Sequence, residues 1–215
     1  PSCKMIRGKT VSTVYLDMGR VITLPPGREN WQALVREVGL PEKQFIGRYR
    51  NGRYEYDKGA MEPEEFWLHV CNGCGRKPDA AKIERLIAAD TRCWAEYEQR
   101  MIDWSDRLWD AGYATGILSN MAVPYAQVVR SEMDWLRRFS FHVLSGEIKQ
   151  MKPEPGIYRT AIDACGTAPE QILFIDDLPE NIAAAREAGM HGIVFTGVED
   201  LHETITARYG LPPVL

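Results

Sequence analysis

The chain has 215 residues, of which 45% are hydrophobic, and its formal net charge is −4. This length and composition suit one domain, or a core domain with an insertion, and supply enough apolar side chains for a buried core. The small negative charge gives no indication of a nucleic-acid or membrane surface, and no apolar run has the length of a transmembrane helix. We therefore expect neither a nucleic acid nor a membrane as a partner, and the sequence does not predict an oligomeric state.

The five cysteines do not suggest a disulfide framework. An odd count in a chain of this size is more typical of a reducing compartment, and the amino terminus lacks a signal-peptide pattern, so we expect a cytoplasmic protein. Cys71 and Cys74 have the spacing of half a zinc site, but no second pair follows and His69 is poorly spaced for a ligand. We interpret them as incidental thiols at a helix end.

The first element is a short apolar run, Val14-Tyr15-Leu16, that predicts a buried strand ending at Asp17. The Pro25-Pro26-Gly27 segment then predicts a break in the chain. From there to about residue 94 the pattern is helical, with helices expected around residues 31–38, from residue 41, around residues 62–70 and from residue 78. Between them, residues 51–59 are expected to form a polar, aromatic loop. We interpret this part as a helical domain inserted into a second domain.

Beyond residue 98 the pattern alternates between strands and helices. Strands are expected at residues 113–120, 139–144, 172–175 and 192–195, and helices between them and at residues 199–209. This alternation predicts right-handed βαβ units and a parallel sheet. We therefore assign residues 1–23 and 96–215 to the core domain and residues 24–95 to the inserted helical domain.

Polar side chains follow three of the predicted strands: Asp17, the pair Ser119 and Asn120, and the pair Asp176 and Asp177. The carboxyl ends of parallel strands are where open α/β sheets bind ligands. Three carboxylates at one place repel each other, and a divalent cation relieves that repulsion. Because the ligands offered are oxygens only, we expect Mg²⁺.

A phosphoryl group is the substrate that fits this arrangement. Asp17 can attack phosphorus and form an aspartyl-phosphate, while Ser119 and the backbone N–H groups after it hold the phosphoryl oxygens. Lys152 follows the third strand in a loop stiffened by Pro153 and Pro155, so it can supply the balancing positive charge.

These motifs, in this order, resemble the haloacid dehalogenase-like hydrolase superfamily over nearly the whole chain. The resemblance is closest to a phosphatase-like branch that includes the amino-terminal domain of soluble epoxide hydrolase and small bacterial sugar-phosphate phosphatases. It implies an α/β fold with a Rossmann-like parallel sheet, helices on both faces and an inserted α-helical cap. The motifs are Leu16-Asp17, Leu118-Ser119-Asn120, Lys152-Pro153-Glu154-Pro155 and Asp176-Asp177.

The resemblance also implies roles for single residues. Asp17 is then the nucleophile, and Lys152 stabilises both it and the phosphoryl group, which Ser119 and Asn120 also bind. Asp177 is the chief Mg²⁺ ligand, assisted by Asp176, and Asp17 and the Gly19 carbonyl complete the metal site. Asn181 supports the metal ligands from the next helix. The expected activity is a Mg²⁺-dependent hydrolysis of a small phosphorylated metabolite.

Gly19 departs from the usual pattern, because most phosphatases of this family carry a second aspartate there as general acid and base. Loss of a general acid typically costs about 10²–10⁴-fold in rate. Two other functions therefore stay open. A metal-independent 2-haloacid dehalogenase needs no acid for its leaving group, although the Asp176-Asp177 pair argues against it. A catalytically silent binding protein needs no acid either, although the retained Asp17, Lys152 and Asp177 argue against it.

Several cationic and aromatic side chains could select the substrate. Arginine recognises phosphate or carboxylate groups, and tyrosine stacks on sugars or bases. We expect one or two of them to face the site when the cap closes. The candidates are Arg20, Arg48, Arg53, Tyr54 and Tyr56.

Overall fold

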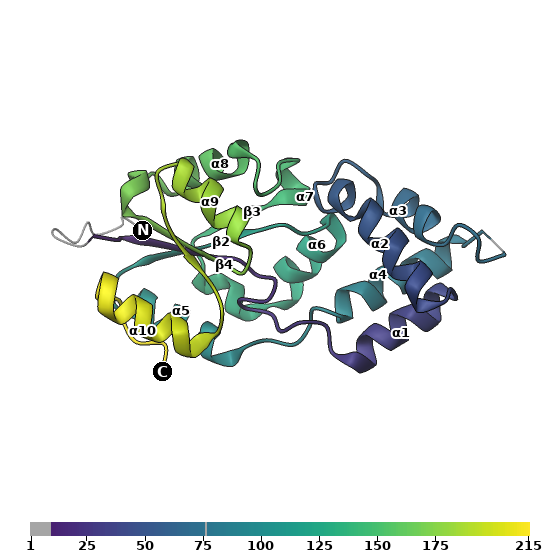
Figure 1. Ribbon diagram of the computed structural model, residues 1–215, viewed down its shortest axis with the longest axis horizontal. Helices are drawn as coiled ribbons and strands as arrows, with labels where there is room; N and C mark the ends of the chain where they lie inside the picture. The colour runs from purple at the N-terminus through teal and green to yellow at the C-terminus, as the bar shows by residue number, and fades with distance from the viewer. Residues whose placement is uncertain (1–9, 76) are drawn as a thin grey trace.

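A computed structural model describes residues 10–75 and 77–215, so the first nine residues of the expected core domain lie outside the described part (Figure 1). Five parallel strands form one sheet in the order β3-β2-β1-β4-β5. The first strand lies in the middle, paired with β2 on one side and β4 on the other. This confirms the predicted parallel α/β sheet. The strands are β1 (Thr13–Leu16), β2 (Ala114–Ser119), β3 (Phe141–Leu144), β4 (Ile172–Asp176) and β5 (His191–Val194).

Helices cover both faces of the sheet, because successive side chains of each strand point to opposite faces. Val14 and Leu16 pack into one apolar cluster, and Tyr15 between them packs into another. The first cluster lies under α5 (Gln99–Asp110), α6 (Val123–Glu132) and α10 (Val198–Tyr209). The second lies under α8 (Pro155–Cys165) and α9 (Pro179–Glu187).

Four helices between β1 and β2 form a separate body at one end of the molecule (Figure 1). They enclose their own apolar cluster, which includes Phe45, Tyr56, Phe66 and Trp67. The two segments that connect them to the sheet run side by side, since Leu24 N–H donates to the Glu96 carbonyl and the Glu98 N–H to the Ile22 carbonyl, both at 2.8 Å. The structure thus confirms the inserted helical cap. Its helices are α1 (Arg28–Val38), α2 (Glu42–Asp57), α3 (Pro63–Val70) and α4 (Ala80–Arg92).

The prediction of a loop at residues 51–59 was wrong, because α2 continues through Asn51-Gly52 to Asp57. A β-carbon at Gly52 would lie 3.2 Å from the Phe66 ring, so the glycine allows α2 to pack closely against α3. Arg53 and Asp57 form an i,i+4 ion pair at 2.8 Å that supports this last part of the helix. Tertiary packing here outweighs the turn preference of Asn-Gly.

Three short helical segments were not expected: η1 (Asp134–Arg138), α7 (Ser145–Ile148) and η2 (Pro169–Gln171). The most consequential is α7, which directly follows β3 and faces the cap. In the part of the chain that the structure describes, we find no helix with both the length and the apolar character needed to cross a membrane.

Candidate active site

Three carboxylates gather at the carboxyl ends of the two central strands. Asp17 directly follows β1, and its N–H donates to the Ile175 carbonyl of the neighbouring β4 at 2.9 Å. Asp176 ends β4, and Asp177 comes next. The three side chains each place one oxygen so that all three oxygens lie within 4.8 Å of one another. Parallel pairing of β1 and β4 in this register therefore brings together two motifs that are about 160 residues apart in the sequence.

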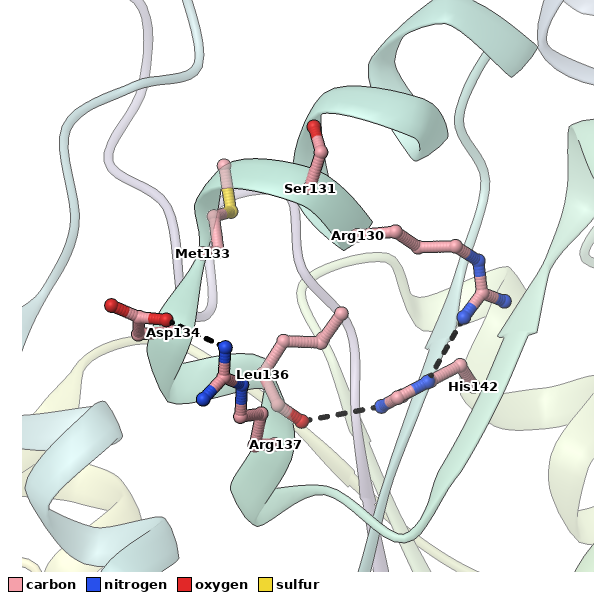
Figure 2. Close-up of a pocket in the computed structure, with 7 residues that line it drawn as sticks. All are labelled: Arg130, Ser131, Met133, Asp134, Leu136, Arg137 and His142. Atoms are coloured by element: carbon pink, nitrogen blue, oxygen red, sulfur yellow. Dashed lines mark hydrogen bonds and ion pairs between the residues drawn. The ribbon is translucent and has the colours of Figure 1, made fainter.

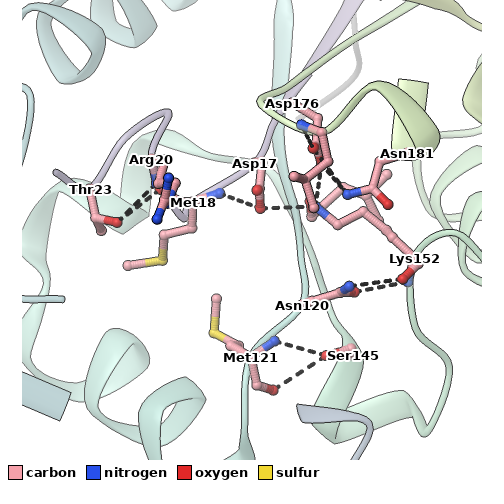
Figure 3. A network of polar contacts seen from close by, with 12 residues as sticks. Asp17, Met18, Arg20, Thr23, Asn120, Met121, Ser145, Lys152, Asp176 and Asn181 are labelled. Carbon is pink, nitrogen blue, oxygen red and sulfur yellow. Dashed lines mark hydrogen bonds and ion pairs between the residues drawn. The ribbon is translucent and has the colours of Figure 1, made fainter. Parts of the chain in front are cut away.

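The Lys152 ammonium lies inside this cluster (Figure 3). Its Nζ is 2.9 Å from Asp17 Oδ1 and 2.6 Å from Asp176 Oδ2, and it donates to the Leu118 carbonyl at 3.0 Å. The side chain is only 1% exposed. These three partners take up the three donors of an ammonium group, so Lys152 is held in one position.

The backbone of Lys152 is fixed by Asn120. The Asn120 Nδ2 donates to the Lys152 carbonyl and Asn120 Oδ1 accepts from the Lys152 N–H, both at 2.9 Å. The structure therefore shows the Asn120 amide holding the lysine loop, a contact that sequence reasoning did not foresee. Its neighbour Ser119 is buried at the end of β2.

Asp176 is held by several donors at once. Asn181 Nδ2, on α9, lies 3.0 Å from each of the two Asp176 oxygens, and the Leu178 N–H donates to Oδ1 at 2.8 Å. Together with Lys152, these donors fix the Asp176 carboxylate in one orientation. The structure thus places Asn181 against Asp176.

The charges of the cluster do not balance. The pKa of Asp17 is raised to about 6, because burial and the neighbouring Asp176 outweigh the lowering effects of Lys152 and the Ser119 hydroxyl. Burial and Asp176 also raise the pKa of Asp177, while Arg20 lowers it. Burial alone would lower the pKa of Lys152, but Asp17 and Asp176 together raise it. One ammonium therefore compensates three carboxylates only in part.

This excess of negative charge, with oxygen donors only, fits a hard divalent cation. Asp17 Oδ1 lies 2.9 Å from the Lys152 ammonium and accepts from the Met18 N–H at 2.7 Å, and neither contact uses Oδ2. The residues that could hold Mg²⁺ are Asp17, Asp177 and the Gly19 carbonyl. Asp176, engaged by Lys152 and Asn181, is better placed to position the cluster than to bind the cation directly.

Beside Asp17, the chain turns through Gly19 and Arg20. A β-carbon at Gly19 would lie 4.0 Å from Asp17 Oδ2 and 3.9 Å from Cζ3 of Trp94, with no closer neighbour. Sequence reasoning placed Trp94 at the cap boundary and gave it no role. Arg20 has a left-handed backbone (φ 61°) and an exposed side chain.

Only one of the four cap candidates, Tyr54, contacts the segment that follows Lys152. The Tyr54 hydroxyl donates to Glu154 Oε1 at 2.5 Å, and Glu154 lies two residues after Lys152. Lys58 binds the same oxygen at 2.6 Å. These two contacts join the end of α2 to the lysine loop. Arg53 instead lies in a mostly buried ionic network within the cap, with Asp57 and Asp90.

The other two cap candidates lie elsewhere. The Tyr56 ring is 2% exposed and stacks on Phe66 at 4.1 Å inside the cap cluster. The Arg48 guanidinium points toward Gly73 at the far end of α3, with Nη2 3.3 Å from where a β-carbon would be. The structure does not bring either side chain to the strand ends.

The cap and the site are also joined by Ser145, which sequence reasoning passed over. Its hydroxyl donates to the Asp57 carbonyl at 2.5 Å and accepts from the Met121 N–H at 2.8 Å. Figure 3 shows the contacts between Ser145 and Met121. Met121 lies two residues after Ser119, so one hydroxyl connects α2 to the segment expected to bind phosphate. The Ser145-Gly146 pair after a strand was the available sequence signal.

One cavity lies away from this cluster, next to the edge strand β3 (Figure 2). It measures about 170 Å³ and lies between Arg130, Leu136 and His142. His142 contacts Arg130 Nη1 at 3.2 Å and the Leu136 carbonyl at 3.3 Å, and burial lowers its pKa. None of the site residues predicted from the sequence lines this cavity.

Comparison with known proteins agrees with this geometry. The family model of the haloacid dehalogenase-like hydrolases matches residues 15–189. Validoxylamine A 7'-phosphate phosphatase from Streptomyces hygroscopicus subsp. limoneus is 25% identical over 80% of this chain and 79% of its own length. Bifunctional epoxide hydrolase 2 from Rattus norvegicus is 35% identical over 81% of this chain, which spans about a third of that protein (34%).

Solved structures share the fold. A haloacid dehalogenase family enzyme from Bacteroides thetaiotaomicron superposes with a TM-score of 0.75 at 23% identity, over 92% of this chain and 99% of that chain. The L-2-haloacid dehalogenase from Xanthobacter autotrophicus superposes with a TM-score of 0.66 at 17% identity, over 94% of this chain and 85% of that chain. With the family model covering most of the sequence and the strand ends carrying its polar motifs, the chain belongs to the haloacid dehalogenase-like hydrolases.

Proposed function

We propose that this hydrolase is a Mg²⁺-dependent phosphomonoesterase for a small phosphorylated metabolite, with Asp17 as the nucleophile. The observation that carries the proposal is the buried Lys152 ammonium, bonded to Asp17 and Asp176 while Asp177 lies alongside. A cluster with this surplus of carboxylate charge suits a cation and a phosphoryl group together. The validoxylamine phosphate phosphatase among the relatives supports the same reaction class.

The chain's own residues suit each part of the reaction. Oδ1 of Asp17 is held by Lys152 and the Met18 N–H, so Oδ2 is the oxygen that attacks phosphorus. Ser119 and the N–H groups that follow it hold the phosphoryl oxygens. Asp17, Asp177 and the Gly19 carbonyl would hold a Mg²⁺ ion, which would neutralise charge on the phosphoryl group. Water then hydrolyses the aspartyl-phosphate and restores Asp17.

Within this proposal, residues 24–95 form a cap that excludes water from the site. Tyr54 is the cap residue best placed to influence substrate choice, because its hydroxyl contacts Glu154 of the lysine loop. Arg53 is engaged by Asp57 and Asp90 within the cap, so an effect of Arg53 on substrate choice would be indirect. The cysteine usage supports a cytoplasmic location.

A dehalogenase is the second candidate, because Gly19 provides no acid for a leaving group and the fold is similar to that of the Xanthobacter enzyme. Displacement of a halide by Asp17 needs neither acid nor metal. The pair Asp176 and Asp177 disfavours this function, since extra carboxylates beside the nucleophile offer nothing to a metal-free site. A silent binding protein is disfavoured by the fully engaged Lys152.

Hydrolysis of p-nitrophenyl phosphate tests the proposal. We expect turnover with Mg²⁺, loss of turnover with EDTA, and loss of turnover in the Asp17→Asn variant. Folded protein that releases no nitrophenol under any of these conditions contradicts a phosphatase. Halide release from 2-haloacids without metal would then identify the dehalogenase.

A further inference from the structure

We propose that Gly19 and Trp94 form a leaving-group subsite without a proton donor, so that the enzyme selects phosphoesters whose leaving group departs unprotonated. This inference rests on the proposed phosphatase function and specifies its substrate class. The class comprises phosphoesters of acidic hydroxyl groups, such as phenolic, enolic or anomeric ones.

The space beside the nucleophile is open on the side of Gly19. A β-carbon there would be 4.0 Å from Asp17 Oδ2, so a longer side chain at residue 19 would extend next to the attacking oxygen. Attacking and leaving oxygens of a phosphoryl transfer lie roughly in line. The leaving group therefore departs away from Asp17, toward the cap, and glycine offers it no side-chain proton.

Trp94 bounds this space with an apolar ring edge. Its Cζ3 would be 3.9 Å from the same β-carbon, so the indole lies where a side chain from residue 19 would extend. The indole is partly buried and packs against both the cap cluster and the adjoining cluster of the core. An aromatic side chain in this place offers contact area to a ring or chain of the leaving group.

The backbone around Trp94 is held firmly in place. The Tyr125 hydroxyl donates to the Trp94 carbonyl at 2.9 Å. Two residues further on, Glu96 accepts from the Leu24 N–H at 2.8 Å, which pairs the two segments that connect cap and core. Trp94 therefore stays beside Gly19 as part of the junction between the two bodies.

The neighbouring polar groups are already engaged. Lys152 donates to the Leu118 carbonyl, Asp17 and Asp176, which uses all three of its donors. Asn120 is bonded twice to the backbone of Lys152. Neither of these two groups has a free proton to give to the leaving oxygen.

The chemical step balances without an acid. The bond from Asp17 Oδ2 to phosphorus forms as the bond from phosphorus to the leaving oxygen breaks. The electron pair of the broken bond stays on the leaving oxygen, which departs as an anion and takes a proton from water. The rate of this step should then depend steeply on the basicity of the leaving group, because glycine supplies no proton to the developing charge.

A series of phosphomonoesters tests this dependence. We would measure kcat/KM for aryl and alkyl phosphates of increasing leaving-group pKa, with wild type, Gly19→Asp and Gly19→Asn. The expected result is a steep fall of log(kcat/KM) in wild type. Gly19→Asp should raise kcat/KM for alkyl phosphates by about 10²-fold or more, as a positioned general acid does. The matched Gly19→Asn variant, of the same size but without the acid, should not.

The contact with Trp94 is tested separately. Trp94→Ala should raise KM for aryl phosphates several-fold more than for a small alkyl phosphate, while inhibition by inorganic phosphate stays unchanged. Trp94→Phe should retain most of the preference for aryl leaving groups.

The possible results distinguish a failure of this inference from a failure of the proposed phosphatase function. Turnover that depends on Asp17 but falls only slightly with leaving-group pKa overturns the inference and keeps the phosphatase. Equal effects of Trp94→Ala on aryl and alkyl substrates also overturn it. If wild type shows no turnover beyond that of the Asp17→Asn variant, the proposed phosphatase function itself is contradicted.

Discussion

The Asp17→Asn substitution should stabilise the metal-free protein at neutral pH, although it removes the proposed nucleophile. Burial is the largest cause that raises the pKa of Asp17 from 3.8 to about 6. A carboxyl whose pKa is higher in the folded state binds its proton more tightly there than in the unfolded chain. Its contribution to stability is therefore favourable below about pH 4 and is lost as pH rises to about 6. A shift of about two units corresponds to about 3 kcal/mol.

Asparagine has the shape of the protonated acid and does not ionise, so the variant does not lose this contribution to stability as the pH rises. Urea unfolding in EDTA, at about pH 4.5 and about pH 7.5, measures the difference between wild type and variant. At the higher pH we expect Asp17→Asn to be more stable by up to about 3 kcal/mol, and at the lower pH by less than about 1 kcal/mol. Titrating groups that do not touch Asp17 cancel in the comparison, whereas Lys152 and Asp176 interact with Asp17 and contribute to the measured difference.

Two controls sharpen this experiment. The exposed Asp163 on α8 provides a matched Asp163→Asn variant, which should stay within about 0.5 kcal/mol of wild type at both pH values. Saturating Mg²⁺ should stabilise wild type more than Asp17→Asn, because one ligand of the cation is lost. A variant less stable than wild type at about pH 7.5, or a difference that persists in acid, would refute the reasoning.

Three further changes test other parts of the structure. Lys152→Met leaves two buried carboxylates uncompensated, so urea unfolding at neutral pH should show a loss of about 3–5 kcal/mol. Gly59→Ala places a β-carbon 2.3 Å from the Gly146 carbonyl oxygen at φ 72°, whereas Gly39→Ala at φ 80° has no atom within 4 Å. The midpoint temperature of thermal unfolding should therefore fall more in Gly59→Ala than in Gly39→Ala. Equal decreases in the two variants would contradict the close contact. Glu154→Gln weakens the link between α2 and the lysine loop, so hydrogen exchange at the end of α2 should become faster while urea unfolding changes little.

Much of the site could be predicted because strand ends are local features. Val14-Tyr15-Leu16 followed by Asp17, and the apolar run before Asp176, each mark a strand and its end within a few residues. The alternation of strands and helices then predicts that these ends share one edge of a sheet. That β1 pairs with β4, so that the two aspartates lie side by side, is a property of the strand order.

The contacts that position the site could not be predicted in the same way, because they join residues distant in sequence. The Asn120 amide holds a lysine backbone 32 residues away. Trp94 approaches Gly19 only because the two segments that connect cap and core run side by side. The Asn51-Gly52 pair favours a turn locally, and only the packing of α2 on α3 explains why the helix continues.

The placement of α2 indicates how a cap can influence the chemistry without touching the phosphoryl group. The Ser145 hydroxyl donates to the Asp57 carbonyl of α2 and accepts from the Met121 N–H beyond Ser119. A movement of α2 removes the acceptor of that hydroxyl, which is buried and must find another partner. The Met121 carbonyl, 3.3 Å from the Ser145 hydroxyl, is a second acceptor within reach. Displacement of the cap would then shift hydrogen bonds in the segment that we propose to bind phosphate, which would couple the position of the cap to phosphate binding through one serine.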